Sequence, residues 1–167
     1  MYEICLYGNP LLRLKAKKVT TFDDSLQEFA EILVEKMYEY DGIGLAAPQI
    51  GQSICAIALD LSAESNSPMV LFNPEVTWSS EELDSDSEGC LSVPDIRGIV
   101  ERPISISVKA QAIDGKEIVF EKVDGLFARA LQHEMDHLQG VMFVDRLSPA
   151  KRSMLSGKLK KMAKQNK

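Results

Sequence analysis

The sequence lacks long hydrophobic runs. None of its apolar stretches approaches the ~20 residues that a membrane-spanning helix needs. Its first residues also lack the basic, apolar and small-residue regions of a secretory signal. Cysteine is scarce, and three residues, an odd number, favour a reducing compartment over a disulfide framework. The chain is therefore predicted to form one compact domain over residues 1–167, located in the cytoplasm and without contact to a membrane.

Histidine is scarcer still. The chain has two, His133 and His137, both within LQHEMDHLQG. Four residues make about one helical turn, so both rings are predicted on one face of a helix from about Leu126 to Gln139. Two neutral imidazoles aimed at one point suit a metal ion, and HEMDH matches the H-E-x-x-H pattern, whose glutamate is a general base. A surface helix that carries two histidines without a metal is the alternative.

A catalytic metal site needs a third protein ligand and an open position for water. No histidine remains to serve as this ligand. A thermolysin-like site would take an acidic ligand from a later helix, but the one acid after the histidines, Asp145, lies in an apolar run, which disfavours this arrangement. Cys55 lies in a strand-like apolar run, as a core cysteine would, and Cys5 has no glycine or polar context. Cys90 stands beside Gly89, which permits an unusual backbone conformation. Cys90 is the predicted ligand, with a buried structural cysteine as the alternative.

The helical wheel predicts what surrounds the metal. Glu134 and Asp136 flank the histidines at similar angles, so the wheel alone leaves the base open. Glu134 is preferred because of its longer reach and its place in the motif. Leu126, Arg129 and Ala130 share the histidine face. An apolar lining is therefore expected beside the metal, with room above the small Ala130 for a hydrophobic substrate group.

A glycine-rich stretch, GIGLAAPQIG, covers residues 42–51. Its glycine spacing resembles the motif of dinucleotide-binding sites. However, it follows a predicted helix and precedes a strand, the reverse of the order that such a site needs. No nucleotide cofactor is therefore expected. Its glycines would let a ligand approach the backbone, and Gln49 would donate a hydrogen bond to a developing oxyanion.

Hydrophobic periodicity predicts an α+β fold, with antiparallel or mixed sheets around the HEMDH helix. Asp24 and Gln27 are expected to form a capping box at the first helix. The acidic segment 79–89 is expected to be turn-rich, and Asp114–Gly115 to turn a hairpin. The other predicted elements are a helix within residues 21–42 and strands within 53–61, 69–76, 103–114 and 116–123.

The net charge of −6 is unevenly distributed. Residues 151–167 carry seven positive charges and no acid, which leaves the rest of the chain at −13. Ser148 as N-cap and Pro149 at the first helical position predict a basic C-terminal helix over residues 149–164. This helix either binds a polyanion such as nucleic acid or is a solvated helix that packs on the domain. The residues expected to pack it are Met154, Leu155, Leu159 and Met162.

Three stretches, GIGLAAPQIG, EGCLSVP and QHEMDHLQG, resemble in order and spacing the signature motifs of peptide deformylases, which remove the formyl group from the initiator methionine of new proteins. The resemblance extends from GNPLLR to DRLSPAKR and suggests a bacterial protein. It implies Fe²⁺ as the usual metal, with Zn²⁺, Ni²⁺ or Co²⁺ as substitutes. It also implies Cys90, His133 and His137 as ligands and Glu134 as general acid and base.

The resemblance further implies that Gln49 and the backbone N–H of Leu91 stabilise the tetrahedral intermediate. The substrate would be a nascent formyl-methionyl peptide that adds to a strand edge. The ribosome is an implied partner of the helix 149–164, because some deformylases dock such a helix there. The predicted substrate-binding residues are Ile43, Gly44, Leu126, Arg129 and Ala130.

Two other functions fit the same residues. A metallopeptidase would use the same metal and base on ordinary peptide bonds. A non-catalytic metal-binding module would need a fourth ligand, and no fourth cysteine or histidine accompanies the trio.

Overall fold

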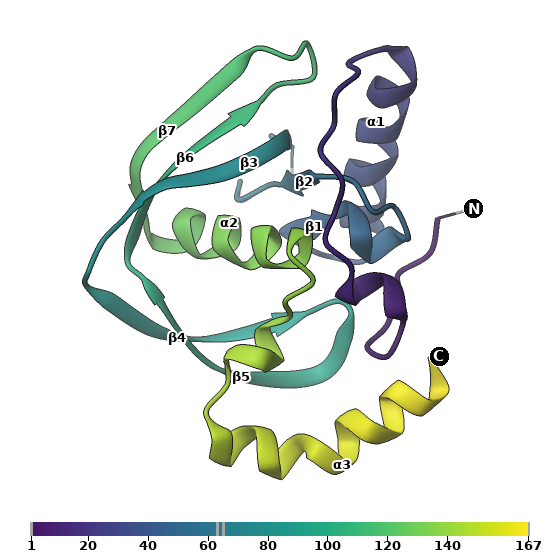
Figure 1. Ribbon diagram of the computed structural model, residues 1–167, viewed down its shortest axis with the longest axis vertical. Coiled ribbons are helices and arrows are strands. Elements are labelled where there is room, and N and C mark those ends of the chain that lie inside the picture. Colours follow the sequence, from purple (N-terminus) through teal and green to yellow (C-terminus); the bar gives the residue numbers. More distant parts are fainter. Residues whose placement is uncertain (1, 63, 65, 167) are drawn as a thin grey trace.

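The structure is a computed structural model that describes residues 2–62, 64 and 66–166. It is α+β, as the sequence predicted, with sheets arranged around a central helix (Figure 1). The α-helices are α1 (Asp24–Glu39), α2 (Gly125–Leu138) and α3 (Pro149–Gln165). The strands are β1 (Gly44–Ala46), β2 (Ala56–Leu59), β3 (Met69–Ser79), β4 (Leu83–Cys90), β5 (Val93–Pro103), β6 (Ser105–Gln111) and β7 (Glu117–Asp124). Short 3₁₀ helices cover Pro10–Arg13, Ala47–Ile50 and Phe143–Arg146.

Five strands form one antiparallel sheet in the order β1-β2-β3-β6-β7, and β4 pairs with β5 in a second sheet. The predicted hairpin is confirmed, since β6 and β7 pair on either side of Gly115. β1 stands at an edge of the larger sheet, because β2 is its one neighbour in the strand order. The central helix α2 lies inside the curve of both sheets (Figure 1).

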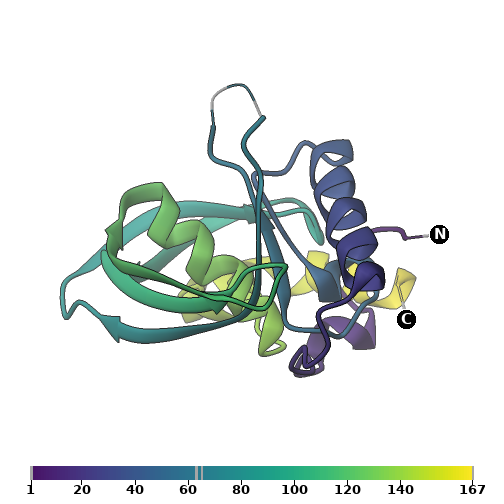
Figure 2. The same cartoon turned by 90° about the horizontal axis from the view of Figure 1, so that it is seen from above.

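The larger sheet separates α1 from α2 when the molecule is seen from above (Figure 2). Its strand β2 is buried on both faces, which explains why its sequence is continuously apolar. Ile57 and Leu59 pack in the cluster that contains Leu131 of α2, whereas Ala56 and Ala58 pack in the cluster that contains α1. The alternation predicted for β6 is confirmed, because its apolar residues Ile106, Val108 and Ala110 are buried.

Two local predictions were wrong. The cap of α1 is Asp23, whose carboxylate accepts the N–H of Leu26, one residue before the predicted Asp24. The acidic segment 79–89 forms most of β4 rather than turns. β4 pairs along β5, which was not predicted at all, because β5 turns Gly98 and Arg102 inward and so breaks the apolar alternation.

The C-terminal helix begins as predicted, with the Ser148 hydroxyl accepting the N–H of Lys151. Leu159 is buried, and Leu155 and Met162 are partly buried beside it, at the i, i+4, i+7 spacing of one helical face. Met154 lies off that face and is 80% exposed, so its predicted packing role was wrong. Among the described residues, no helix combines the length and the apolar character that crossing a bilayer requires.

Candidate metal centre

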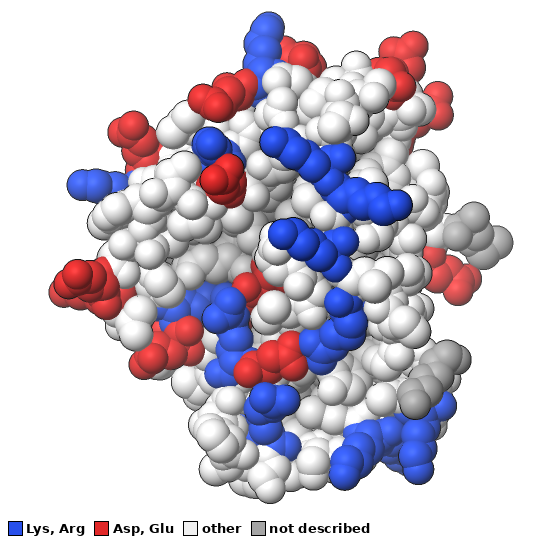
Figure 3. Space-filling model, in the orientation of Figure 1, with Lys and Arg blue, Asp and Glu red and all other residues white. Residues whose placement is uncertain are grey.

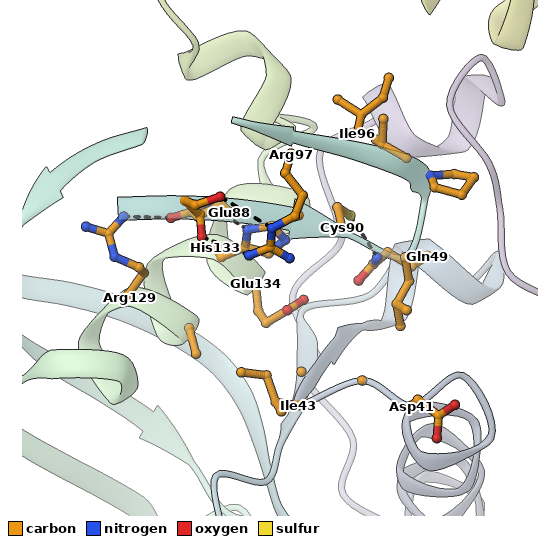
Figure 4. A pocket seen from close by; sticks show the side chains of 18 of the residues that line it. Asp41, Ile43, Gln49, Glu88, Cys90, Ile96, Arg97, Arg129, His133 and Glu134 are labelled. Atoms are coloured by element: carbon orange, nitrogen blue, oxygen red, sulfur yellow. Dashed lines mark hydrogen bonds and ion pairs between the residues drawn. The ribbon is translucent and has the colours of Figure 1, made fainter. Parts of the chain in front are cut away.

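The three predicted ligands come together in space. Helix α2 presents His133 and His137 one turn apart. β4 ends at Cys90, which lies near His133 in Figure 4. One donor atom from each of the three residues lies within 4.8 Å of the others, and the Sγ of Cys90 is 3.3 Å from Nε2 of His137. Thiolate and imidazole donors at this spacing fit a single transition-metal ion.

Glu88 fixes the orientation of His133. Its Oε2 lies 3.0 Å from Nδ1 of His133, which leaves Nε2 as the ring nitrogen on the side of Cys90 that a metal ion could use. Arg102 donates to both Glu88 oxygens, at 2.6 and 2.9 Å, and Arg129 adds a third bond at 3.0 Å. Burial raises the pKa of Glu88, but the hydrogen bonds from Arg102 and His133 outweigh it and hold that pKa well below its usual range. The carboxylate that contacts Nδ1 of His133 is therefore negatively charged.

Sequence reasoning missed both Glu88 and Arg102. The signal for Glu88 was its position two residues before Cys90, on the same strand. Nothing in the sequence indicated Arg102, because an arginine outside any predicted strand is expected to lie in an exposed loop.

The two histidines experience opposite environments. Burial lowers the pKa of His137 well below its ordinary value, which favours the neutral ring that binds metals. Burial also lowers the pKa of His133, but its hydrogen bonds with Cys90 and Glu88 outweigh this and hold it well above the ordinary value. The surroundings therefore favour positive charge at His133 and disfavour it at His137.

The two acids of the HEMDH helix differ in their surroundings. Oε2 of Glu134 is buried and has no hydrogen-bond partner among the described residues. Its carboxyl lies against Gly44, where a Cβ atom would come within 2.5 Å of Oε1. Burial raises the pKa of Glu134 to about 7. Asp136 instead accepts hydrogen bonds from Arg102 and Arg146. Glu134 is therefore the acid with a free oxygen at the centre.

A cavity of about 560 Å³ opens in front of the ligands. Half-exposed Ile43 and Leu126 stand on its wall, and the small Ala130 lies deeper, at 7% exposure. Arg97 also lines the cavity, and sequence reasoning did not select it. All the predicted substrate-binding residues line this space, together with Gln49, Cys90, Leu91, His133 and Glu134.

Gln49 is held with its amide nitrogen toward the sulfur (Figure 4). Its Oε1 accepts the N–H of Ala46 at 2.9 Å, and its Nε2 donates to Ser92 Oγ at 3.1 Å and lies 3.5 Å from Cys90 Sγ. The side chain is 2% exposed. The amide is therefore held in one orientation at the cavity wall, with its nitrogen directed toward Ser92 and the sulfur of Cys90.

Arg129 lines the cavity with its donors already engaged. Its guanidinium donates to Glu88 and to the backbone oxygens of Val100 and Asp84. It therefore forms part of the wall and supports Glu88.

Two helical imidazoles, one thiolate and a free buried carboxylate at an open cavity define a metal-dependent hydrolase. A family model described as polypeptide deformylase matches residues 1–153. The chain belongs to the peptide deformylase family, whose members are metal-dependent enzymes that remove the N-formyl group from nascent peptides. This is the activity of the chain as well.

Similar proteins match along nearly the full chain. The peptide deformylase of Thermotoga sp. (strain RQ2) is 46% identical, over 98% of this chain and 98% of that protein. The one from Brucella suis is 44% identical, over 97% and 93%. The crystal structure of the Thermotoga maritima enzyme matches with a TM-score of 0.84 and 44% identity, covering 89% of this chain and 99% of that one. The Plasmodium falciparum enzyme matches with a TM-score of 0.92 and 33% identity, covering 98% and 96%.

Proposed function

We propose that Cys90, His133 and His137 hold one divalent metal ion and that Glu134 transfers the protons of deformylation. The observation that supports this most directly is the meeting of three metal-donor atoms within 4.8 Å beside a buried carboxylate whose Oε2 is unpartnered among the described residues. The cavity in front of them has room for the end of a peptide chain. The reaction converts an N-formyl-methionyl peptide and water into formate and a methionyl peptide.

The residues divide the chemistry among them. A divalent ion in this site supplies Lewis acidity, which lowers the pKa of a water molecule and polarises the formyl oxygen. Glu134 removes the proton of the attacking water and later returns it to the leaving amine, a task suited to a carboxyl with a pKa near 7. The amide of Gln49 and the backbone N–H of Leu91 donate hydrogen bonds to the oxyanion.

The substrate backbone adds to the edge of the larger sheet at β1. β1 is short and terminal in the strand order, and the cavity is lined by Ile43 and Gly44 at its start. An extended peptide on this edge gains main-chain hydrogen bonds. Its methionine side chain then lies in the apolar space beside Leu126 and Ala130.

The function is tested by comparing formyl-methionyl peptides with unformylated peptides of the same sequence. Formate release from the formylated series, with no cleavage of internal peptide bonds in either series, is the expected result. Cleavage of an internal or N-terminal peptide bond would instead show a metallopeptidase.

We propose Fe²⁺ as the native metal, with Zn²⁺, Ni²⁺ or Co²⁺ as functional substitutes. The mixed thiolate and imidazole set accepts each of these ions, so the donor set alone does not select one. Purification without oxygen, followed by metal analysis and an activity assay, should return about one iron per chain in the most active preparation. A zinc-loaded protein of higher activity would contradict the assignment.

Enlarging Ala130 to leucine should reduce kcat/KM for formyl-methionyl peptides by about tenfold or more, because the added volume competes with the methionine side chain. Peptides that begin with formyl-alanine should lose much less. Ala150→Leu, on the exposed first turn of α3, is the control. Equal losses for both substrates, with a lower melting temperature, would indicate a packing defect instead.

We also propose that the chain works in the cytoplasm and that α3 docks on ribosomal RNA. Positive side chains gather over α3 at the lower edge of the molecule in Figure 3. Phosphate contacts by such a cluster release counterions and make binding sensitive to salt.

Replacing the exposed Lys160, Lys161 and Lys164 with glutamate should abolish salt-sensitive co-sedimentation with ribosomes, while activity on short formyl peptides persists. The matched control changes the exposed Lys15, Lys17 and Lys18, which alters the net charge equally. If co-sedimentation with ribosomes falls to the same extent in both triple variants, α3 is not the docking element.

A further inference from the structure

Part of the cavity wall is an irregular segment of β5. In the β4–β5 ladder, Cys90 pairs with Val93 and Gly89 pairs with Arg97. The three residues between, Pro94–Ile96, therefore have no partners on β4 and form a bulge. All three line the cavity in front of the metal ligands.

The bulge needs support from outside its own sheet. Asp95 has a φ of 59°, in the left-handed region that non-glycine residues seldom adopt. One support is Ile96, which is 3% exposed and packs in the cluster that contains Leu147 and Leu159. Leu159 belongs to α3, so the C-terminal helix reaches the back of the cavity wall.

The second support is a hydrogen bond from the residue before Leu159. The ammonium group of Lys158 donates to the backbone oxygen of Asp95 at 2.9 Å. Among the described lysines of α3, it is the one whose ammonium makes such a bond within the molecule. α3 runs beneath β5, as Figure 1 shows, so this bond joins the basic helix to the irregular part of the wall.

We propose that Lys158 is a positioning residue for the substrate cavity. Its hydrogen bond holds Asp95 in the left-handed conformation and so fixes the bulge Pro94–Ile96 against which the peptide lies. This rests on the proposed function of the cavity. The ligands and Glu134 stand on β4 and α2, so loss of the bond should weaken substrate binding and leave the chemical step intact.

The test compares three variants by steady-state kinetics on formyl-methionyl tripeptides. Lys158→Met keeps the aliphatic stem and removes the donor, and Lys158→Arg keeps a donor. Lys151→Met is the control on the same helix. Lys158→Met should raise KM by about threefold to tenfold, the range for one lost hydrogen bond, with kcat within about twofold of the parent. The arginine variant and the control should retain the parent KM.

Amide hydrogen exchange gives a second readout that does not depend on activity. Lys158→Met should accelerate exchange at Asp95 and Ile96, and Lys151→Met should not. The proposal is overturned if the two methionine variants agree in KM and in exchange, or if kcat falls while KM stays. Faster exchange with an unchanged KM also overturns it, because the bulge would then move without consequence for the substrate. A chain inactive on all formyl peptides would defeat the proposed function, while exchange would still decide whether Lys158 holds the bulge.

Discussion

Glu134→Gln is expected to lower kcat on formyl-methionyl peptides by about 10²–10⁴-fold, because an amide cannot accept the proton of the attacking water. The substitution keeps nearly the same shape at a site that is 5% exposed and pressed against Gly44. The fold and the three ligands should therefore be retained. Activity and metal content, measured on the same preparation, separate loss of the base from loss of the metal.

Asp136→Asn is the matched control on the same helix. Asp136 accepts hydrogen bonds from Arg102 and Arg146, so its substitution weakens two ion pairs. We expect a loss of about 1–3 kcal/mol in the free energy of unfolding, with a fall in kcat of less than about tenfold. If both variants lost activity equally with full metal content, Glu134 would not be the specific base.

The residues proposed as metal ligands could be selected from the sequence because their signals are local. His133 and His137 repeat at the helical period, and the chain holds no other histidine. Cys90 was separated from Cys55 by context, and the structure places Cys55 in the cluster beneath α2, with its Sγ bonded to the backbone oxygen of Ala16. The β6–β7 hairpin was equally local, because strict alternation and a turn dipeptide define it.

The hydrogen bonds by which Glu88 and Arg102 orient His133 could not be predicted, because they depend on pairing between strands. Glu88 contacts Arg102 only when β4 and β5 pair. The sequence does not show the alternation of apolar residues that would predict β5, because Gly98 and Arg102 occupy two of its inward positions. The ambiguity between Glu134 and Asp136 had the same origin. The helical wheel places both acids near the metal, and only arginines from β5 and from the segment after α2 distinguish their environments.

Cys90→Ser is expected to remove tight metal binding and with it nearly all activity. A serine hydroxyl remains protonated near neutral pH, so it is a far weaker anionic donor than a thiolate. It also changes the environment of Gln49, whose Nε2 lies 3.5 Å from the sulfur, although Ala46 and Ser92 still hold that amide. Metal content after gel filtration, followed by titration with Zn²⁺, measures the loss.

The matched control is Cys55→Ser, because Cys55 is also half-buried and its sulfur donates to a backbone oxygen that a hydroxyl can equally satisfy. It should keep one metal per chain and most of the activity. An emptied site in Cys55→Ser together with a loaded site in Cys90→Ser would overturn the ligand set. Loss of metal in Cys90→Ser alone, with an unchanged far-ultraviolet circular dichroism spectrum, would show that this thiolate completes the centre that His133 and His137 begin.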